Sequence, residues 1–187
     1  MIMRTFVALR EYNITNELIY QRVDLLEINQ IDNKKQIRHL FNALNKSKEH
    51  PQQGIFFKGQ IYDAYTFAAD LIRSAKQSLT LIDNFIDDTV LTLFIKRKKG
   101  VSLQIITQKD SKELLLDIKK HQEQYPDVKL VLNRNFHDRF LIINEQQVYH
   151  FGASLKDLGK KCFAFTKMNK ELSTLIIGNI LKINSSY

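Results

Sequence analysis

The sequence predicts an α/β fold, with a mixed, largely parallel sheet flanked by helices and preceded by an N-terminal helical segment. Short apolar runs typical of buried strands alternate with segments that carry apolar side chains at helical spacing. Strands that are separated by helices favour right-handed crossovers and parallel pairing. Neither Pro nor Gly occurs before Pro51, which favours an almost wholly helical start to the chain.

Residues 1–48 are predicted to be helical, and within them one seam repeats at alternating intervals of four and three residues. The seam consists of Ile19, Val23, Leu26, Gln30, Asn33, Ile37, Leu40 and Leu44. Two interpretations are open. Either the seam pairs two chains, with Gln30 and Asn33 setting the register, or the helix lies on its own domain and the polar pair occupies a solvated gap. Pro51 and Gly54 mark residues 48–54 as a linker.

Residues 54–170 are predicted to form the main domain, and residues 171–187 a C-terminal helix or tail. Strands are expected at residues 54–60, 78–83, 101–107, 128–132, 140–143, 147–151 and 164–168. Helices are expected at residues 62–75, 89–98 and 111–124. The strands at 140–143 and 147–151 are close enough in sequence to form a hairpin.

The 187-residue chain has a formal net charge of +8, which favours anionic partners. Its basic residues are concentrated in the C-terminal two thirds, which favours nucleic acid. The single cysteine, Cys162, excludes an intramolecular disulfide and a multi-cysteine metal site, and fits a reducing compartment. No apolar run approaches the roughly 20 residues of a membrane span, and no signal peptide is recognisable. We therefore expect a cytoplasmic protein without membrane association.

Polar clusters follow or flank the predicted strands at residues 83–84, 107–109 and 137–139, and a small-residue stretch follows at 152–154. In open α/β sheets, ligands bind beyond the carboxyl ends of the strands. An imidazole can attack phosphorus or protonate a leaving oxygen, and a guanidinium binds phosphate oxygens as a fork. Glycine at a strand end lets backbone N–H groups approach an anion. These clusters predict a phosphate site.

The acidic residues Asp83, Asp87 and Asp88 have two interpretations, a metal site or a helix N-terminus. We favour the second, because Asp87 and Asp88 directly precede the helix predicted from Thr89. Asp83 is then expected at the rim of the phosphate site. No metal and no cofactor are expected.

The octapeptide at 137–144 resembles the HxKxxxxD signature of the phospholipase D superfamily, with His137, Arg139 and Asn144 at the H, K and D positions. Gly152 and Ser154 resemble the glycine-serine element that usually follows. The stretches at 54–57, 81–88 and 152–161 are similar to the C-terminal domain of bacterial DNA-binding proteins of the phage-antirepressor or RhuM type. Residues 4–27 resemble the helical end of the preceding DNA-binding region, which implies a fragment of a longer, mobile-element-associated protein.

This resemblance implies a phospholipase D-like fold and a site built from two facing motifs. One histidine forms a phosphohistidine intermediate and the other protonates the leaving group, so a chain with one motif needs a homodimer. The implied catalytic residues are His137, Arg139, Asn144 and Ser154. The implied phosphate- or nucleic-acid-binding residues are Arg139, Gly152, Ser154, Lys156 and Asn84.

Departures from the signature leave the function open between three hypotheses. Arg139 replaces the usual Lys, Asn144 replaces the usual Asp, and Leu155 stands where an Asn is often found. The first hypothesis is a degenerate domain that binds phosphate or nucleic acid and dimerises a DNA-binding protein. DNA is the favoured nucleic acid. The second is a metal-independent nuclease or phosphodiesterase that acts as a homodimer, with His137 as nucleophile and general acid. The third is a purely structural oligomerisation domain.

Overall fold

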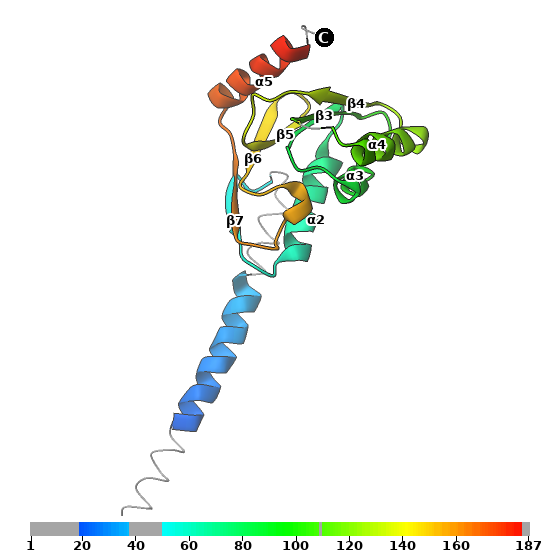
Figure 1. Cartoon of the computed structure of the whole chain (residues 1–187). Helices are drawn as coiled ribbons and strands as arrows, with labels where there is room; N and C mark the ends of the chain where they lie inside the picture. Colours follow the sequence, from blue (N-terminus) through cyan, green and yellow to red (C-terminus); the bar gives the residue numbers. More distant parts are fainter. Residues whose placement is uncertain (1–18, 38–49, 109, 185–187) are drawn as a thin grey trace, which may run out of the picture. The chain divides into compact units, whose positions relative to one another are not determined.

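The computed structural model describes residues 19–37, 50–108 and 110–184 (Figure 1). The chain divides into two compact units, Met1–His50 and Pro51–Tyr187, and each is described by itself. In the first unit residues 19–37 are one helix. The seam positions Leu40 and Leu44 and the stretch at 1–18 lie outside the described residues.

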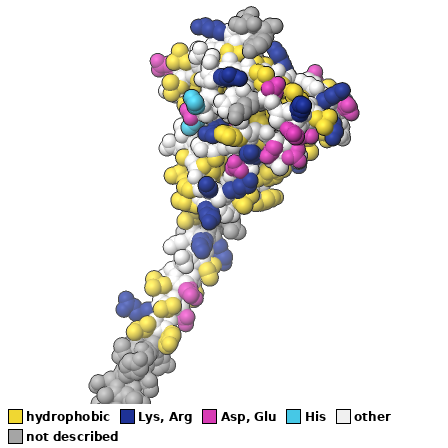
Figure 2. All heavy atoms as spheres, in the orientation of Figure 1, with side chains coloured by type: hydrophobic (Ala, Val, Ile, Leu, Met, Phe, Trp, Pro, Cys, Tyr) yellow, Lys and Arg dark blue, Asp and Glu magenta, His cyan; other side chains and the backbone are white. Residues whose placement is uncertain are grey.

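The helix at residues 19–37 carries large apolar side chains that are exposed to solvent (Figure 2). They include the predicted seam residues Ile19, Val23, Leu26 and Ile37, and also Leu25, Ile28 and Ile31. Among the described residues, no helix combines the length and the apolar character that crossing a membrane requires.

The second unit is an α/β domain. Along the chain it contains β1 (Gln53–Phe56), α2 (Ile61–Ser74), β2 (Ser78–Ile82), α3 (Asp88–Phe94), β3 (Ser102–Thr107), α4 (Lys112–Gln124), β4 (Val128–Leu132), β5 (Arg139–Ile143), β6 (Gln147–Phe151), the 3-10 helix η1 (Leu155–Asp157), β7 (Phe163–Lys167) and α5 (Lys170–Asn184). The predicted hairpin of β5 and β6 is confirmed. The helix predicted at 89–98 ends earlier, at Phe94.

The seven-stranded sheet has the order β1-β7-β6-β5-β2-β3-β4. The α/β architecture with a mixed sheet is confirmed, but the expectation of a largely parallel sheet is wrong. In the part of the chain that the structure describes, only β2 with β3 and β3 with β4 pair in parallel. The pairings of β2 with β5, β5 with β6, β6 with β7 and β1 with β7 are antiparallel.

The lengths of the connections between strands explain why the sheet contains both parallel and antiparallel pairs. A parallel pair needs a crossover of a dozen or more residues, and α3 and α4 provide these between β2, β3 and β4. The segment from β4 to β5, residues 133–138, is too short for such a crossover. The chain therefore returns across the end of the sheet, and β5 pairs antiparallel with β2, with Ile82 opposite Phe140.

Helices cover both faces of the sheet (Figure 1). The larger core lies between one face and α2, α3 and α4, where α2 buries Ala64, Ala68, Leu71 and Ile72 at helical spacing. The smaller core lies on the other face, where Ile180 of α5 packs with side chains of the central strands. Because helices cover both faces, the polar loops meet at one end of the sheet, at the C-terminal end of β2.

Candidate functional site

Sheet register brings the predicted site segments to one end of the sheet. β2 ends at Ile82, which pairs with Phe140, and Arg139 pairs with Phe151 at the end of β6. The residues after β2, the residues before β5 and the residues after β6 are therefore neighbours. Asp83, Asn84, His137, Arg139 and Ser154 all lie at this end.

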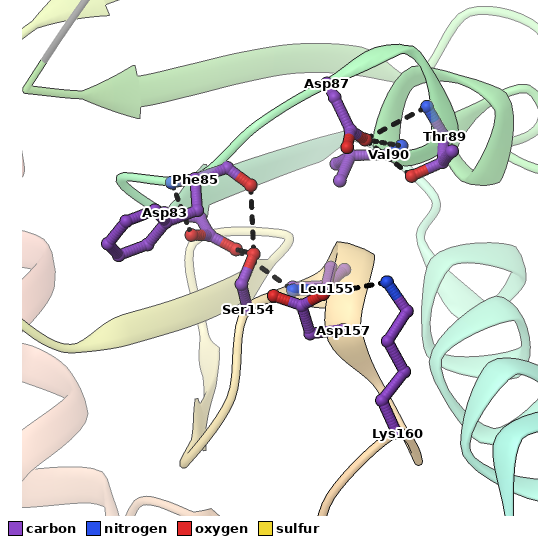
Figure 3. A network of polar contacts seen from close by, with 9 residues as sticks. All are labelled: Asp83, Phe85, Asp87, Thr89, Val90, Ser154, Leu155, Asp157 and Lys160. Atoms are coloured by element: carbon purple, nitrogen blue, oxygen red, sulfur yellow. Dashed lines mark hydrogen bonds and ion pairs between the residues drawn. The ribbon is translucent and has the colours of Figure 1, made fainter.

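Asp83 is the buried centre of this end of the sheet (Figure 3). Its Oδ1 accepts from the backbone N–H of Phe85 at 2.9 Å, and its Oδ2 accepts from the backbone N–H of Leu155 at 3.0 Å. The Oγ of Ser154 lies 2.7 Å from Oδ2 of Asp83 and 3.0 Å from the carbonyl oxygen of Phe85. One carboxyl group thus ties the turn after β2 to the segment after β6.

Burial raises the pKa of Asp83 above its ordinary value of 3.8. The hydrogen bonds from Ser154, Phe85 and Leu155, and then the charge of Arg139, act in the opposite direction. The single hydroxyl hydrogen of Ser154 has two acceptors within reach, Oδ2 of Asp83 and the carbonyl oxygen of Phe85.

Arg139 lies at the start of β5 with its guanidinium carbon 5.4 Å from the centre of the Phe85 ring. The Nζ atom of Lys156, from η1, lies 5.9 Å from the same ring centre. Among the described residues, no hydrogen-bond partner reaches the buried Nε of Arg139. The structure therefore brings Arg139 and Lys156 together around one aromatic ring and leaves a buried donor unpaired.

His137 is exposed in the loop before β5. The residue before it, Phe136, is hydrogen-bonded to the side chain of Asn84. The side-chain Nδ2 of Asn84 donates to the carbonyl oxygen of Phe136 at 2.8 Å. Its Oδ1 accepts from the backbone N–H of Gln108 at 3.1 Å. Asn84, predicted to bind phosphate, thus connects the loops after β2 and β3 to the loop that carries His137.

Asn144 does not join this group, because it follows the opposite end of β5. Its Oδ1 accepts from the backbone N–H groups of Lys76 at 2.8 Å and Gln77 at 2.9 Å. It adopts a positive φ of 54°, which asparagine tolerates better than most residues. Asn144 therefore connects the β5–β6 turn to the start of β2, far from Arg139.

Gly152 lies at the site end, but its backbone N–H already donates to the carbonyl oxygen of Ala164 at 2.9 Å. A Cβ atom at this position would lie 3.1 Å from that oxygen. Close pairing of β6 with β7 accounts for the glycine. The predicted role of its N–H in binding phosphate has no support from this geometry.

The prediction that Asp87 and Asp88 mark the N-terminus of a helix is confirmed. Asp87 is the N-cap of α3, and its carboxylate accepts from the backbone N–H groups of Thr89 and Val90 (Figure 3). Within the described residues, no group of three or more His, Cys, Asp or Glu side chains could hold a metal ion. Arg97 belongs to the basic residues 96–99 after α3. It donates to the carbonyl oxygens of Tyr125 and Pro126 and so connects this loop to the loop between α4 and β4.

Phe85 is the site residue that the sequence did not single out. Phe85 is 48% exposed and lies between the buried strand β2 and helix α3. The sequence did contain a signal for this residue, because Phe85 is an aromatic residue in the polar turn 83–88, directly after a buried strand. Its neighbours Arg139 and Lys156 are too distant in sequence for spacing to reveal the contact.

Charge alone does not outline the site. On the face shown in Figure 2, Lys and Arg side chains lie among acidic and apolar ones instead of forming one continuous basic surface. The local arrangement of Arg139 and Lys156 is therefore more informative than the net charge of +8.

No protein-family model and no curated protein matches the sequence. Among solved structures, "NucT from Helicobacter pylori" is similar at 15% identity with a TM-score of 0.54, over 72% of this chain and 96% of that one. The fold is phospholipase D-like. Two other solved structures are similar over parts of their length. They are TrmBL2, described as an archaeal chromatin protein (17% identity, TM-score 0.46, 93% of this chain and 68% of that one), and phosphatidylserine synthase from Haemophilus influenzae Rd KW20 (12%, 0.47, 68% and 36%).

Proposed function

We propose that the phospholipase D-like unit binds nucleic acid through its phosphate groups, and that Arg139 and Lys156 supply the contacts beside His137. The observation that carries the proposal is the buried, unpartnered Nε of Arg139 within the described part of the chain. A buried donor without a partner costs about 1–3 kcal/mol. A phosphate oxygen would satisfy it once the Arg139 side chain turns outward, and the guanidinium fork suits two oxygens of one phosphate.

The electrostatics of the site support the same ligand. Because burial raises the pKa of Asp83, this carboxyl offsets less of the charge of Arg139 than an exposed carboxylate would. Lys156 adds a second cation on the same ring. The resemblance of the sequence to the C-terminal domain of phage-antirepressor or RhuM-type proteins favours DNA among the nucleic acids.

A salt series tests phosphate binding. Labelled DNA is titrated with the whole chain at several salt concentrations, and the same is done with Arg139→Ala and with Arg73→Ala as the charge-matched control. Arg73 pairs with the exposed Asp70 near the end of α2, away from the site. We expect Arg139→Ala to weaken binding and to reduce the salt slope by about one phosphate contact, and Arg73→Ala to change neither. No binding by the unaltered chain at low salt would overturn the proposal.

We further propose that the helix at residues 19–37 pairs two chains. Its seam residues Ile19, Val23, Leu26 and Ile37 are exposed in the described structure, and their four-three spacing suits a coiled coil. A homodimer would also supply two copies of the single signature.

Turnover is the second candidate function, and the exposure of His137 favours it over a purely structural role. In this reaction the His137 imidazole attacks phosphorus, the bond from phosphorus to the leaving oxygen breaks, and His137 of the partner subunit donates a proton to that oxygen. Water then attacks the phosphohistidine, its proton returns to the partner's His137, and the first imidazole is released.

Incubation with DNA, RNA and a chromogenic phosphodiester in EDTA tests this second function. Cleavage by the unaltered chain that His137→Ala abolishes would establish it. Equal or absent cleavage by the two proteins would leave the binding function and exclude the enzyme.

A further inference from the structure

Phe85 presents an exposed aromatic ring on a rigid backbone. Its N–H donates to the buried Asp83, and its carbonyl oxygen lies 3.0 Å from Oγ of the buried Ser154. In Figure 3 the ring points away from this polar network. The preceding residue, Asn84, is also held at both ends of its side chain. Such anchoring fixes the position of the ring at little further cost in conformational entropy when a ligand binds.

Two cations from other elements lie over this ring. The guanidinium carbon of Arg139 is 5.4 Å from the ring centre, and Nζ of Lys156 is 5.9 Å from it. Both distances allow a cation–π attraction, which places positive charge next to an exposed aromatic surface. This combination suits a ligand that carries a flat ring and an anionic group a few ångströms apart.

We propose that Phe85 stacks on an unpaired base while Arg139 and Lys156 bind the adjoining phosphates, so that the site prefers single-stranded to duplex nucleic acid. The inference rests on the proposed function, because it assigns the phosphates to the same two cations. An aromatic platform beside cations tracks a single strand, and stacking of this kind is tolerant of base identity. A duplex keeps its bases stacked on one another and offers this ring only its backbone.

A simpler role for Phe85 is to hold Arg139 and Lys156 in place without touching the ligand. The two roles differ in their dependence on bases. If Phe85 only positions the cations, its loss weakens binding to every phosphate backbone alike. If it stacks on a base, its loss weakens binding only where an unpaired base is present.

The experiment measures fluorescence anisotropy of labelled oligonucleotides of one sequence, as single-stranded DNA, single-stranded RNA, duplex DNA and an abasic single strand. The proteins are the whole chain, Phe85→Leu, Phe85→Tyr and the control Phe57→Leu, which removes another exposed phenylalanine. Circular dichroism checks that each variant is folded.

We expect the unaltered chain and Phe57→Leu to bind the base-containing single strands more tightly than the duplex. Phe85→Leu should lower that affinity about tenfold, leave the abasic strand, the duplex and the salt slope unchanged, and Phe85→Tyr should retain the preference. An equal loss on all ligands, or equal binding of single strand and duplex by the unaltered chain, would overturn base stacking while leaving phosphate binding intact. Failure of every oligonucleotide to bind at low salt would overturn both proposals.

Discussion

The Oγ of Ser154 lies 2.7 Å from Oδ2 of Asp83, and both residues are buried. This contact joins two segments that are distant in sequence, and it places an ionisable group where ionisation is unfavourable. The arrangement makes the stability of the site end of the sheet dependent on pH.

Asp83 is expected to make the unaltered chain less stable as pH rises. Its folded-state pKa is raised above the ordinary 3.8, so the folded state binds the proton more tightly than the unfolded state. The resulting stability is fully present below pH 3.8 and is lost as pH rises through the folded-state pKa. Urea unfolding at a series of pH values measures this loss.

Asp83→Asn removes the titration and should flatten that part of the pH profile. It should also lower the free energy of unfolding, because an amide nitrogen at the Oδ2 position meets the N–H of Leu155. The difference between the two proteins should therefore be largest at acidic pH. Asp70→Asn, at an exposed ion pair, is the control. A parallel pH profile for the unaltered chain and Asp83→Asn would contradict the assignment.

Asn144 is expected to matter for stability and not for ligand binding. Asn144→Ala removes the acceptor of two backbone N–H groups and should lower the free energy of unfolding by about 1–2 kcal/mol. Asn144→Asp retains the acceptor oxygens and should be at least as stable as the unaltered chain. Chemical denaturation and the salt-series binding assay measure the two properties. A loss of nucleic-acid affinity in folded Asn144→Asp would contradict the separation of this residue from the site.

Arg139→Lys restores the residue that the phospholipase D signature usually has, and we expect it to weaken binding. The charge is retained, so the salt slope should stay the same, whereas the fork that holds two phosphate oxygens is lost. The affinity should fall about tenfold or more, the effect of one lost charge-assisted hydrogen bond. Arg73→Lys is the control. Unchanged affinity in Arg139→Lys would show that the fork geometry is not used.

Local patterns predicted the elements of the second unit well. The strands at 128–132 and 147–151 have the predicted bounds because each is a short apolar run between turn residues. The parallel or antiparallel sense of the strands was not predictable in the same way. It depends on which strands become neighbours, and the pairing of Leu79 with Ile143 joins residues that no local pattern relates.

The site was predictable as a set of segments but not as a set of contacts. His137 and Arg139 were found from their spacing, and Asp83 and Asn84 from their place after a strand. Asn144 accepts hydrogen bonds from Lys76 and Gln77, which lie 68 and 67 residues earlier in the chain. The signature alone therefore suggested a place in the site, whereas the structure places Asn144 at the other end of β5.

Leu26→Lys is expected to turn a dimer into a monomer. Leu26 lies on the predicted seam and is 67% exposed, so a charge there would be buried against the partner helix. Ile28→Lys is a closely matched control, because Ile28 is 62% exposed on the same helix but lies outside the seam. Light scattering after size-exclusion chromatography gives the mass of each protein. Twice the chain mass for Ile28→Lys and the single mass for Leu26→Lys would support pairing through the seam, whereas a dimer that survives Leu26→Lys would place the contact elsewhere.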